Sequence, residues 1–262
     1  MSGGAPAADS SNNLYFLTGN GSFDAASGGS NYGDSTIKLS TSGSLHVTDY
    51  FTPDNQCSLA TADQDHGSGG AAILVDQPSG PVPHLLIGGG KFGTLFLVNR
   101  DNMGGYNSGS NNVVQSLGIG KAIFATGAFW NNYFYIAGVA GHLTQYTFNT
   151  STGQFISPAT HSSPSSYGFP GSTPSVSSVG SSANGIVWAL DNSQYCQVSP
   201  GCGPTVLHAY DASDVSTELW NSTQGTGNTA GNAVKFTVPT VANGKVYVPT
   251  LSELTVYGLL PN

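Results

Sequence analysis

The sequence contains very little charge. Charged side chains make up 8% of its 262 residues, whereas soluble proteins average about 25%. The 6 Lys and Arg residues form no cluster, and 14 Asp and Glu residues give a net charge of −8. Because no basic patch is present, we expect neither nucleic-acid binding nor binding to an anionic membrane surface.

Long apolar runs and a leader are also missing. No run approaches the roughly 20 apolar residues that a membrane-spanning helix needs. The residues after Met1 include neither the basic nor the apolar region of a signal peptide. The Asn, Ser and Thr content is typical of secreted or periplasmic bacterial β proteins. We therefore expect an exported protein whose leader was removed, or a chain that starts part-way through a longer one.

Cysteine is scarce, with three residues in the chain. Cys196 and Cys202 flank a Pro200-Gly201 turn, which favours a local disulfide, with two free thiols as the alternative. The His residues are distant, so a zinc site lacks its other ligands. Cys57 is expected to be buried and without a catalytic role.

Short apolar-aromatic strands that follow a turn recur along the chain. The turns begin at residues 12, 83, 131, 184 and 243, and they lead into Leu14–Gly19, Leu85–Gly88, Tyr133–Gly138, Ile186–Leu190 and Lys245–Pro249. A repeat of roughly 40–60 residues built from short strands indicates a β-propeller or a similar array. The 10% aromatic content argues against disorder. We predict an all-β propeller of about five four-stranded blades.

The repeats indicate a single domain over residues 1–262, with units at about 5–55, 70–105, 121–157, 173–222 and 233–259. One unit is predicted to contain strands at 173–179, 186–190, 205–211 and 217–221, and another at 122–129, 133–138, 143–148 and 154–156. The last unit supplies three strands, at 236–241, 245–249 and 254–259. Residues 2–9 are expected to form the inner strand of the first unit, with the two termini near one another.

The three-stranded last unit leaves two interpretations open. Either the last blade has three strands, or its closing strand lies upstream in a longer parent, which we favour. An incomplete ring exposes strand edges, and such edges pair with other chains. We therefore expect either a homo-oligomer assembled through open blade edges or, if the ring closes, a monomer.

Residues 13–105 resemble the pyrroloquinoline-quinone (PQQ)-dependent alcohol dehydrogenases. The resemblance rests on Leu-Thr-Gly-Asn-Gly-Ser-Phe-Asp at 17–24, Tyr-Gly-Asp-Ser-Thr-Ile-Lys-Leu-Ser at 32–40, Asp-Gln-Asp at 63–65, the strand at 71–76, and the Gly-Lys-Phe-Gly…Leu-Val-Asn-Arg-Asp segment at 90–101. These segments occur in the family's order. The chain is similar to the C-terminal part of the family's eight-bladed propeller.

The resemblance implies roles for three residues. Asn20 matches an amide ligand of the Ca²⁺ beside the quinone, Asp34 the general base, and Lys91 the residue that hydrogen-bonds the quinone oxygens. Such a cation takes oxygen ligands and polarises a carbonyl, while the carboxylate accepts the alcohol proton. The quinone itself carries the redox chemistry. The family's Trp floor, its acidic ligand from an earlier blade and its paired adjacent cysteines have no counterpart here.

Each candidate also fits a structural role. Asn20 suits a turn with positive φ, and Asp34 suits a strand start where it bonds nearby backbone amides. Lys91, in a glycine-rich turn, faces either the channel or solvent. Asp63, Asp65 and His66 form the densest ionisable cluster, either converging on a ligand at the channel mouth or forming a turn with internal hydrogen bonds.

Three functions remain as hypotheses. The first is an exported, degenerate quinoprotein-like propeller that acts as a binding or scaffold module, favoured by the missing family residues. The second is an alcohol or sugar oxidoreductase that uses PQQ and Ca²⁺. The third is a carbohydrate-active hydrolase or lyase with Asp34 and Asp65 as its acid/base pair, an analogy at the level of the fold. In each case the partner is a small molecule or carbohydrate at the channel mouth.

Overall fold

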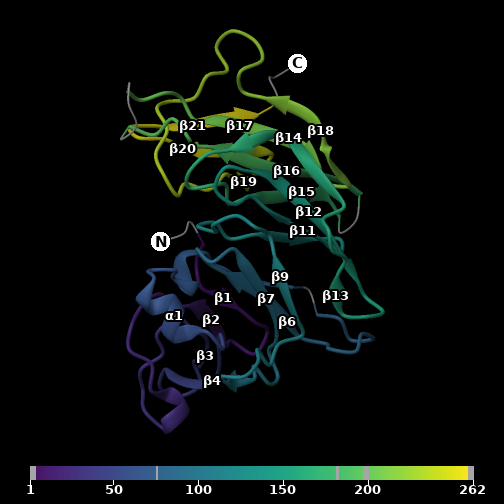
Figure 1. Cartoon of the computed structure of the whole chain (residues 1–262). Helices are drawn as coiled ribbons and strands as arrows, with labels where there is room; N and C mark the ends of the chain where they lie inside the picture. The colour runs from purple at the N-terminus through teal and green to yellow at the C-terminus, as the bar shows by residue number, and fades with distance from the viewer. Residues whose placement is uncertain (1–3, 75, 181–182, 197–200, 259–262) are drawn as a thin grey trace. The chain divides into compact units, whose positions relative to one another are not determined.

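The computed structural model describes residues 4–74, 76–180, 183–196 and 201–258. The chain forms two compact units, described separately here: Met1–Thr126 with Phe148–Phe155, and Gly127–Thr147 with Ile156–Asn262. Figure 1 shows β-strands through almost all of both units. In the described residues, no helix has the length and apolar character that crossing a membrane would require.

The first unit contains two sheets. One has the order β1 (Ala7–Ala8), β2 (Leu14–Leu17), β3 (Thr36–Ser40), β4 (His46–Thr52) and β8 (Gly105–Tyr106). The other has the order β5 (Ala71–Ile73), β6 (Leu85–Gly89), β7 (Thr94–Asn99) and β9 (Gln115–Gly118). All neighbours are antiparallel except β4 and β8. Three short helices lie in the loops: η1 (Ala25–Ser27), α1 (Gln56–Thr61) and η2 (His66–Ser68).

A buried apolar cluster joins these two sheets: Tyr15, Phe51, Leu86, Phe96, Val98 and Met103. It takes residues from β2, β4, β6 and β7, and β6 and β7 are buried on both of their faces. Burial of such side chains stabilises the fold by about 1.5–3 kcal/mol each. The packing fixes the loops at the ends of these strands, where the predicted site residues lie.

The second unit consists of antiparallel sheets. One contains β10 (Ala128–Trp130), β11 (Tyr133–Ile136), β12 (Gly141–Asn149) and β14 (His161–Tyr167). The last two residues of β12 pair with β13 (Gln154–Phe155), and this short hairpin belongs to the first unit. The next has the order β15 (Ser175–Val179), β16 (Ala183–Asp191), β17 (Val206–Asp211) and β18 (Asp214–Asn221). The last has β19 (Thr240–Ala242), β20 (Lys245–Pro249) and β21 (Leu254–Gly258).

Aromatic side chains from several strands fill the core of the second unit. Tyr135, Tyr167 and Tyr210 are fully buried. The hydroxyls of Tyr167 and Tyr210 hydrogen-bond at 2.9 Å, which satisfies two polar groups that burial would otherwise penalise. Trp130 and Tyr133 pack against this cluster and Trp220 against a neighbouring one.

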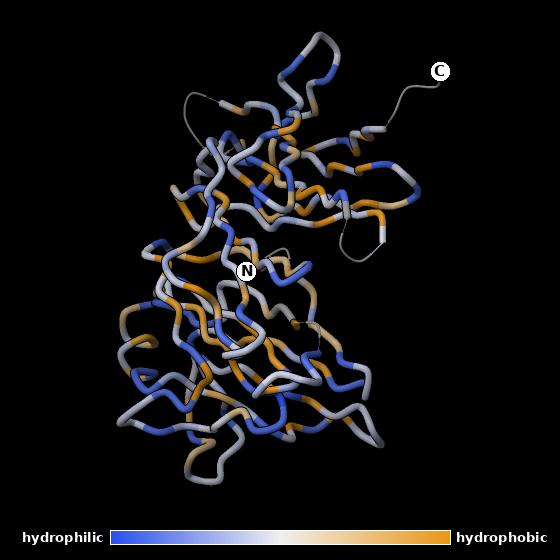
Figure 2. Tube along the Cα trace, turned by 90° about the vertical axis from the view of Figure 1, so that its right-hand side faces the viewer, coloured by the Kyte–Doolittle hydropathy of each residue, from blue (hydrophilic) through white to orange (hydrophobic). Residues whose placement is uncertain are grey.

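The predicted turn-and-strand pattern is confirmed at the level of individual strands. Each predicted aromatic strand lies second in its sheet, as β2, β6, β11, β16 and β20. The turns before four of them contain Asn in the left-handed region: Asn12 (φ 61°), Asn131 (47°), Asn132 (62°), Asn184 (50°) and Asn243 (51°). Asn tolerates positive φ better than most residues. Figure 2 shows hydrophobic stretches along the strands between more hydrophilic loops.

Three local expectations are wrong. The strand predicted over 236–241 begins only at Thr240. The strand predicted over 122–129 begins only at Ala128, because the preceding segment bonds to loops instead. The Ile123 N–H donates to the Gly90 carbonyl, and the Ile123 carbonyl accepts from the Ser68 hydroxyl. Cys57, expected to be buried, is exposed, because it lies on the outer side of α1 while Leu59 is buried.

Two further expectations concern chain ends and cysteines. Of the inner strand expected over residues 2–9, only Ala7–Ala8 forms a strand, β1, among the described residues. The expected proximity of the termini involves residues 1–3 and 259–262, outside the described residues. The predicted disulfide between Cys196 and Cys202 is present, with the Cα atoms 4.2 Å apart.

Candidate functional site

The four residues singled out from the sequence lie on three loops of the first unit. Asn20 follows β2, and Asp34 lies two residues before β3. Asp65 lies between α1 and η2, and Lys91 lies in the turn between β6 and β7. The folding of the two sheets brings these loops together, because backbone bonds join the Asp34 N–H to the Gly19 carbonyl and the Lys91 N–H to the Asp65 carbonyl.

Lys91 is the centre of an ion-paired cluster. Its ammonium lies 2.5 Å from an Asp65 carboxylate oxygen and 3.0 Å from an Asp63 oxygen. It also donates to the Asp63 main-chain carbonyl at 3.1 Å. Since a lysine ammonium has three hydrogens, each of them has an acceptor. Asp65 is the first cause of a raised Lys91 pKa.

Asn20 completes this cluster, as a donor. Its side-chain amide donates to Asp63 at 2.9 Å, and its backbone N–H donates to Asp65 at 3.0 Å. Burial alone would raise the pKa of Asp65, but the hydrogen bonds from Lys91 and Asn20 outweigh it and lower the pKa. Asn20 does not have positive φ, so the alternative reading of it as a left-handed turn residue is wrong.

Asp34 lies beneath the cluster and is fully buried. One carboxylate oxygen accepts the His66 backbone N–H at 3.0 Å, and the other faces the Gln56 amide at 3.5 Å. Burial raises the pKa of Asp34, and the negative charge of Asp65 raises it further. Its bonding partners are remote in sequence, in contrast to the nearby amides expected for a strand-start Asp. Asp34 itself has positive φ (51°).

His66 connects Asp34 to the core. The imidazole packs against Phe51 and Phe96, with ring centroids 6.3 and 5.6 Å away. Its Nε2 lies 2.8 Å from the Thr36 hydroxyl. Burial lowers the pKa of His66 from 6.5 to about 3, so the ring is neutral at pH 7. It therefore positions the backbone N–H that holds Asp34.

Close backbone approach makes small residues necessary here. A Cβ at Gly90 would lie 1.9 Å from the Asp65 carbonyl oxygen, and one at Gly67 would lie 2.4 Å from the Thr18 carbonyl carbon. Real Cβ atoms do not approach backbone so closely, so these glycines let the loops touch. The glycines around Lys91 thus serve loop packing.

The described donors do not fit a calcium ion. Calcium takes 6–8 oxygen ligands, and the described residues contain no group of three or more His, Cys, Asp or Glu side chains placed to hold a metal. The nearest carboxylates to Asn20, those of Asp63 and Asp65, bind Lys91 instead. A quinone would meet the same obstacle, since every Lys91 hydrogen already has an acceptor.

The sequence pointed to Asn20, Asp34, Asp65 and Lys91 as site residues. It did not predict that Gln56 contacts Asp34 or that Thr36 contacts His66. Gln56 and Thr36 are both buried. A Gln inside a short helix and a Thr at a strand start carry no sequence signal for a site. Only the long-range pairing of loops gives them their contacts.

Comparisons with known proteins bear on the fold alone. No protein-family model and no curated protein matches the chain. Among solved structures, it is similar to the β-propeller domain of Cps50 (Swd1) from Myceliophteria thermophila, with a TM-score of 0.54, 9% identity, and coverage of 87% of this chain and 64% of that one. The chain has a β-propeller fold.

Two other solved structures are similar at lower scores. BamB from Moraxella catarrhalis has a TM-score of 0.44 and 13% identity, over 87% of this chain and 59% of that one. The computationally designed Ika8 protein has a TM-score of 0.48 and 11% identity, over 88% of this chain and 57% of that one. The chain thus spans less than two thirds of the length of each of these three solved structures.

Proposed function

We propose that this chain is a non-catalytic β-propeller module that binds or presents a partner, and that the cluster around Lys91 is a structural brace. The bonding of Lys91 is the observation that carries the proposal. Its three ammonium hydrogens point to Asp63 and Asp65 at 3.1, 3.0 and 2.5 Å. A residue that is to donate to a cofactor needs a free hydrogen, and this one has none.

The burial of Asp34 supports the same conclusion. A general base must come within hydrogen-bond reach of the proton that it removes. Asp34 has no exposed surface, and both of its oxygens face donors of the protein. In this arrangement the carboxylate supports the loop that carries His66.

A titration with PQQ and Ca²⁺ tests the proposal. We expect no saturable quinone absorbance, no rise in the thermal midpoint, and no dye-linked oxidation of alcohols or sugars. Quinone binding with alcohol oxidation that disappears in Asp34→Asn would overturn the proposal and support the oxidoreductase hypothesis.

A carbohydrate-active hydrolase or lyase is the second candidate, favoured by one observation. Asp34 has a raised pKa and Asp65 a lowered one, and two carboxyls with pKa values pushed apart are the usual basis of acid/base pairs. Release of reducing ends from a polysaccharide, abolished in Asp34→Asn and kept in Asp63→Asn, would establish this activity. Absence of product release from a polysaccharide panel would remove it.

We further propose that the described sheets are blades of one propeller, and that the last one gains its fourth strand from outside the chain. The support is that neighbouring strands within each sheet are mostly consecutive in sequence, as in propeller blades, while β21 pairs with β20 alone among the described strands. In a longer parent or a second copy, the missing strand would lie on β21.

Export is part of the same proposal. The bond between Cys196 and Cys202 supports it, because disulfides persist mainly in oxidising compartments. Alkylation of the native protein, isolated from its source cells with thiols trapped at lysis, should label only Cys57. Labelling of all three cysteines would contradict an oxidising location.

A further inference from the structure

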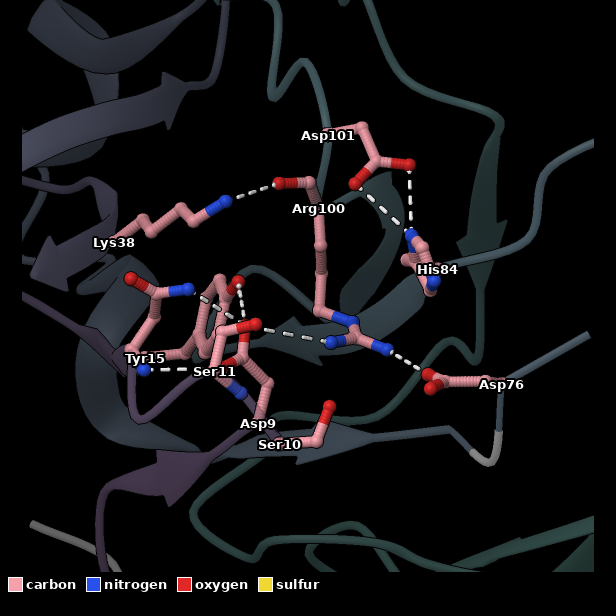
Figure 3. A pocket seen from close by; sticks show the side chains of 10 residues that line it. Asp9, Ser10, Ser11, Tyr15, Lys38, Asp76, His84, Arg100 and Asp101 are labelled. Atoms are coloured by element: carbon pink, nitrogen blue, oxygen red, sulfur yellow. Dashed lines mark hydrogen bonds and ion pairs between the residues drawn. The ribbon is translucent and has the colours of Figure 1, made fainter.

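The first unit contains a second polar cavity, separate from the Lys91 cluster. It has a volume of about 110 Å³ and is lined by Asp9, Ser10, Ser11, Asn13, Tyr15, Lys38, Asp76, His84, Arg100 and Asp101 (Figure 3). A cavity of about 150 Å³ accepts benzene. The pocket therefore has room for roughly four non-hydrogen atoms by that comparison, and a larger ligand would extend past its rim.

Arg100 forms the floor with a fixed guanidinium. Its side chain is only 5% exposed. Nε donates to the Leu85 carbonyl at 3.2 Å, and Nη2 bonds Asp76. Nη1 lies 3.7 Å from the Asp9 carboxylate, which is too long for a hydrogen bond. Nε and Nη2 thus have close acceptors, the Tyr15 hydroxyl also bonds the guanidinium, and the remaining guanidinium hydrogens are left for a ligand.

Lys38 adds a second donor group beside it. Its ammonium donates one hydrogen to the Arg100 main-chain carbonyl at 2.8 Å. The ammonium and the guanidinium lie 5.8 and 5.9 Å from the Tyr15 ring centroid. Figure 3 shows the Lys38 ammonium at the Arg100 main-chain carbonyl and the guanidinium between Asp9 and Asp76. The pocket wall therefore presents fixed N–H groups that can donate to a ligand.

The carboxylates around the pocket have partners of their own. Asp9 accepts bonds of 2.9 Å from the Ser11 N–H, from the backbone and side chain of Asn13, and from the Tyr15 hydroxyl. Asp101 pairs with His84 at 2.8 Å. Asp76 and Asp101 have side chains 50% and 54% exposed, so their remaining oxygen lone pairs can be reached from the rim.

The charge balance decides which ligand fits. Three carboxylates face two permanent cations, so the pocket has no excess positive charge to attract an anion, and the chain carries −8 overall. A cation would meet the Arg100 guanidinium and the Lys38 ammonium, which line the same pocket. A hydroxyl group both accepts and donates. It can take a hydrogen from Arg100 or Lys38 and give one to Asp76 or Asp101.

We propose that this pocket binds a neutral polyhydroxylated molecule through adjacent hydroxyl groups. The source is either a free polyol of glycerol size or the end of a saccharide whose remainder lies outside the pocket. The inference deepens the proposed binding function by naming a ligand class. The pocket uses residues distinct from the Lys91 cluster. The PQQ and Ca²⁺ titration can therefore overturn the proposed function without affecting this inference, and the experiment below can overturn this inference alone.

Titrations followed by ¹H–¹⁵N NMR test the proposal, with glycerol, glucose and maltotriose as probes and sulfate and glycine as charged comparisons. We expect saturating shifts at the amides of Ser11, Asn13 and Asp101 with at least one neutral probe. Tighter binding of maltotriose than of glycerol would identify a saccharide end, and the reverse order a free polyol. Shifts that grow linearly without saturation, or saturation by sulfate or glycine alone, would overturn the proposal.

Variants separate the pocket from general effects. Lys38→Met removes a donor, and Asp101→Asn alters an acceptor at the rim while keeping its size. Each should weaken binding of the best probe at least fivefold. Lys121→Met changes an exposed lysine outside the pocket lining and should leave the affinity within twofold. Equal affinity in all three variants would place the binding elsewhere and refute the assignment.

Discussion

His66 shows how a single residue couples the candidate site to stability. It is 2% exposed, and burial lowers its pKa from 6.5 to about 3. The unfolded chain therefore binds a proton at this residue at a pH where the folded chain does not. Its contribution to stability is complete above pH 6.5 and is lost as the pH falls toward 3.

This linkage predicts an acid-sensitive free energy of unfolding. Between pH 6.5 and 5, His66 should remove about 1.4 kcal/mol per pH unit. In His66→Gln this contribution should vanish, so its urea-unfolding free energy should fall less than that of the wild type over the same range. Asp34 acts in the opposite direction, because its raised pKa makes the folded state bind a proton more readily, but it is present in both proteins. Identical pH profiles would show that His66 does not titrate as described.

At this scale the sequence identified residues but not their bonds. The motif around Asn20, Asp34 and Lys91 was visible as a resemblance, and these residues do lie on neighbouring loops. Their contacts depend on loops far apart in the chain, such as the bond between Asn20 and Asp63. The burial of His66 was hidden, since a His between Asp and Gly in sequence is typical of an exposed turn.

Among the structural elements, the β6–β7 turn is the most constrained part of the site. Gly90 is buried, and a Cβ there would lie 1.9 Å from the Asp65 carbonyl oxygen and 2.5 Å from that of His66. Both obstacles are backbone atoms, so relief requires the turn or the 63–68 loop to move. The turn also carries Lys91, and any movement would separate the ion pair.

Gly90→Ala should therefore destabilise the protein by at least about 2–3 kcal/mol, as overpacking in a tight region does. The matched control is Gly118→Ala in β9, where a Cβ meets nothing within 4 Å and φ is not positive. This control should change the free energy of unfolding by less than about 1 kcal/mol. Chemical denaturation of both variants measures the difference, and equal values would mean that the close approach at Gly90 is not as described.

Strands were more predictable than their connections. Asn before four of the five aromatic strands indicates a left-handed turn, and the apolar-aromatic run after it indicates a strand, as at Asn131 and β11. The segment before Ala128 contains the same residue types but has no edge to pair with, since Gly90 and Ser68 capture Ile123. Local composition does not distinguish a strand from a loop that is held by remote groups.

At the scale of the whole molecule, the last sheet predicts how chains interact. β21 pairs with β20 alone among the described strands, and its Leu254 and Val256 are 57% and 46% exposed. An edge strand with exposed apolar residues is a template for another strand. In the absence of a longer parent, we expect a second copy to occupy it.

Mass measurement over a range of protein concentrations should therefore show reversible dimers. Val256→Lys places a charge on the edge and should weaken the association at least tenfold. Leu45→Lys changes another exposed apolar residue (66% exposed) outside the strands and should leave it unchanged. A wild-type chain that stays monomeric at high concentration would indicate that β21 is covered within one chain.

The ion pair between Lys91 and Asp65 is expected to stabilise the fold. Both side chains are mostly buried, with 17% and 19% exposed, whereas Asp63 is 78% exposed. Removing one member of a buried pair leaves the other charge without compensation, which is costly, while exposed pairs contribute at most about 1 kcal/mol. Asp63→Asn should thus change stability much less than Asp65→Asn.

A double-mutant cycle of Lys91→Met and Asp65→Asn, measured as free energies of unfolding in urea, tests this most directly. We expect a coupling free energy of about 1–3 kcal/mol between the two residues, and each single variant should be less stable than the wild type. A coupling near zero, with Lys91→Met as stable as the wild type, would contradict the structural brace and leave Lys91 free for a ligand.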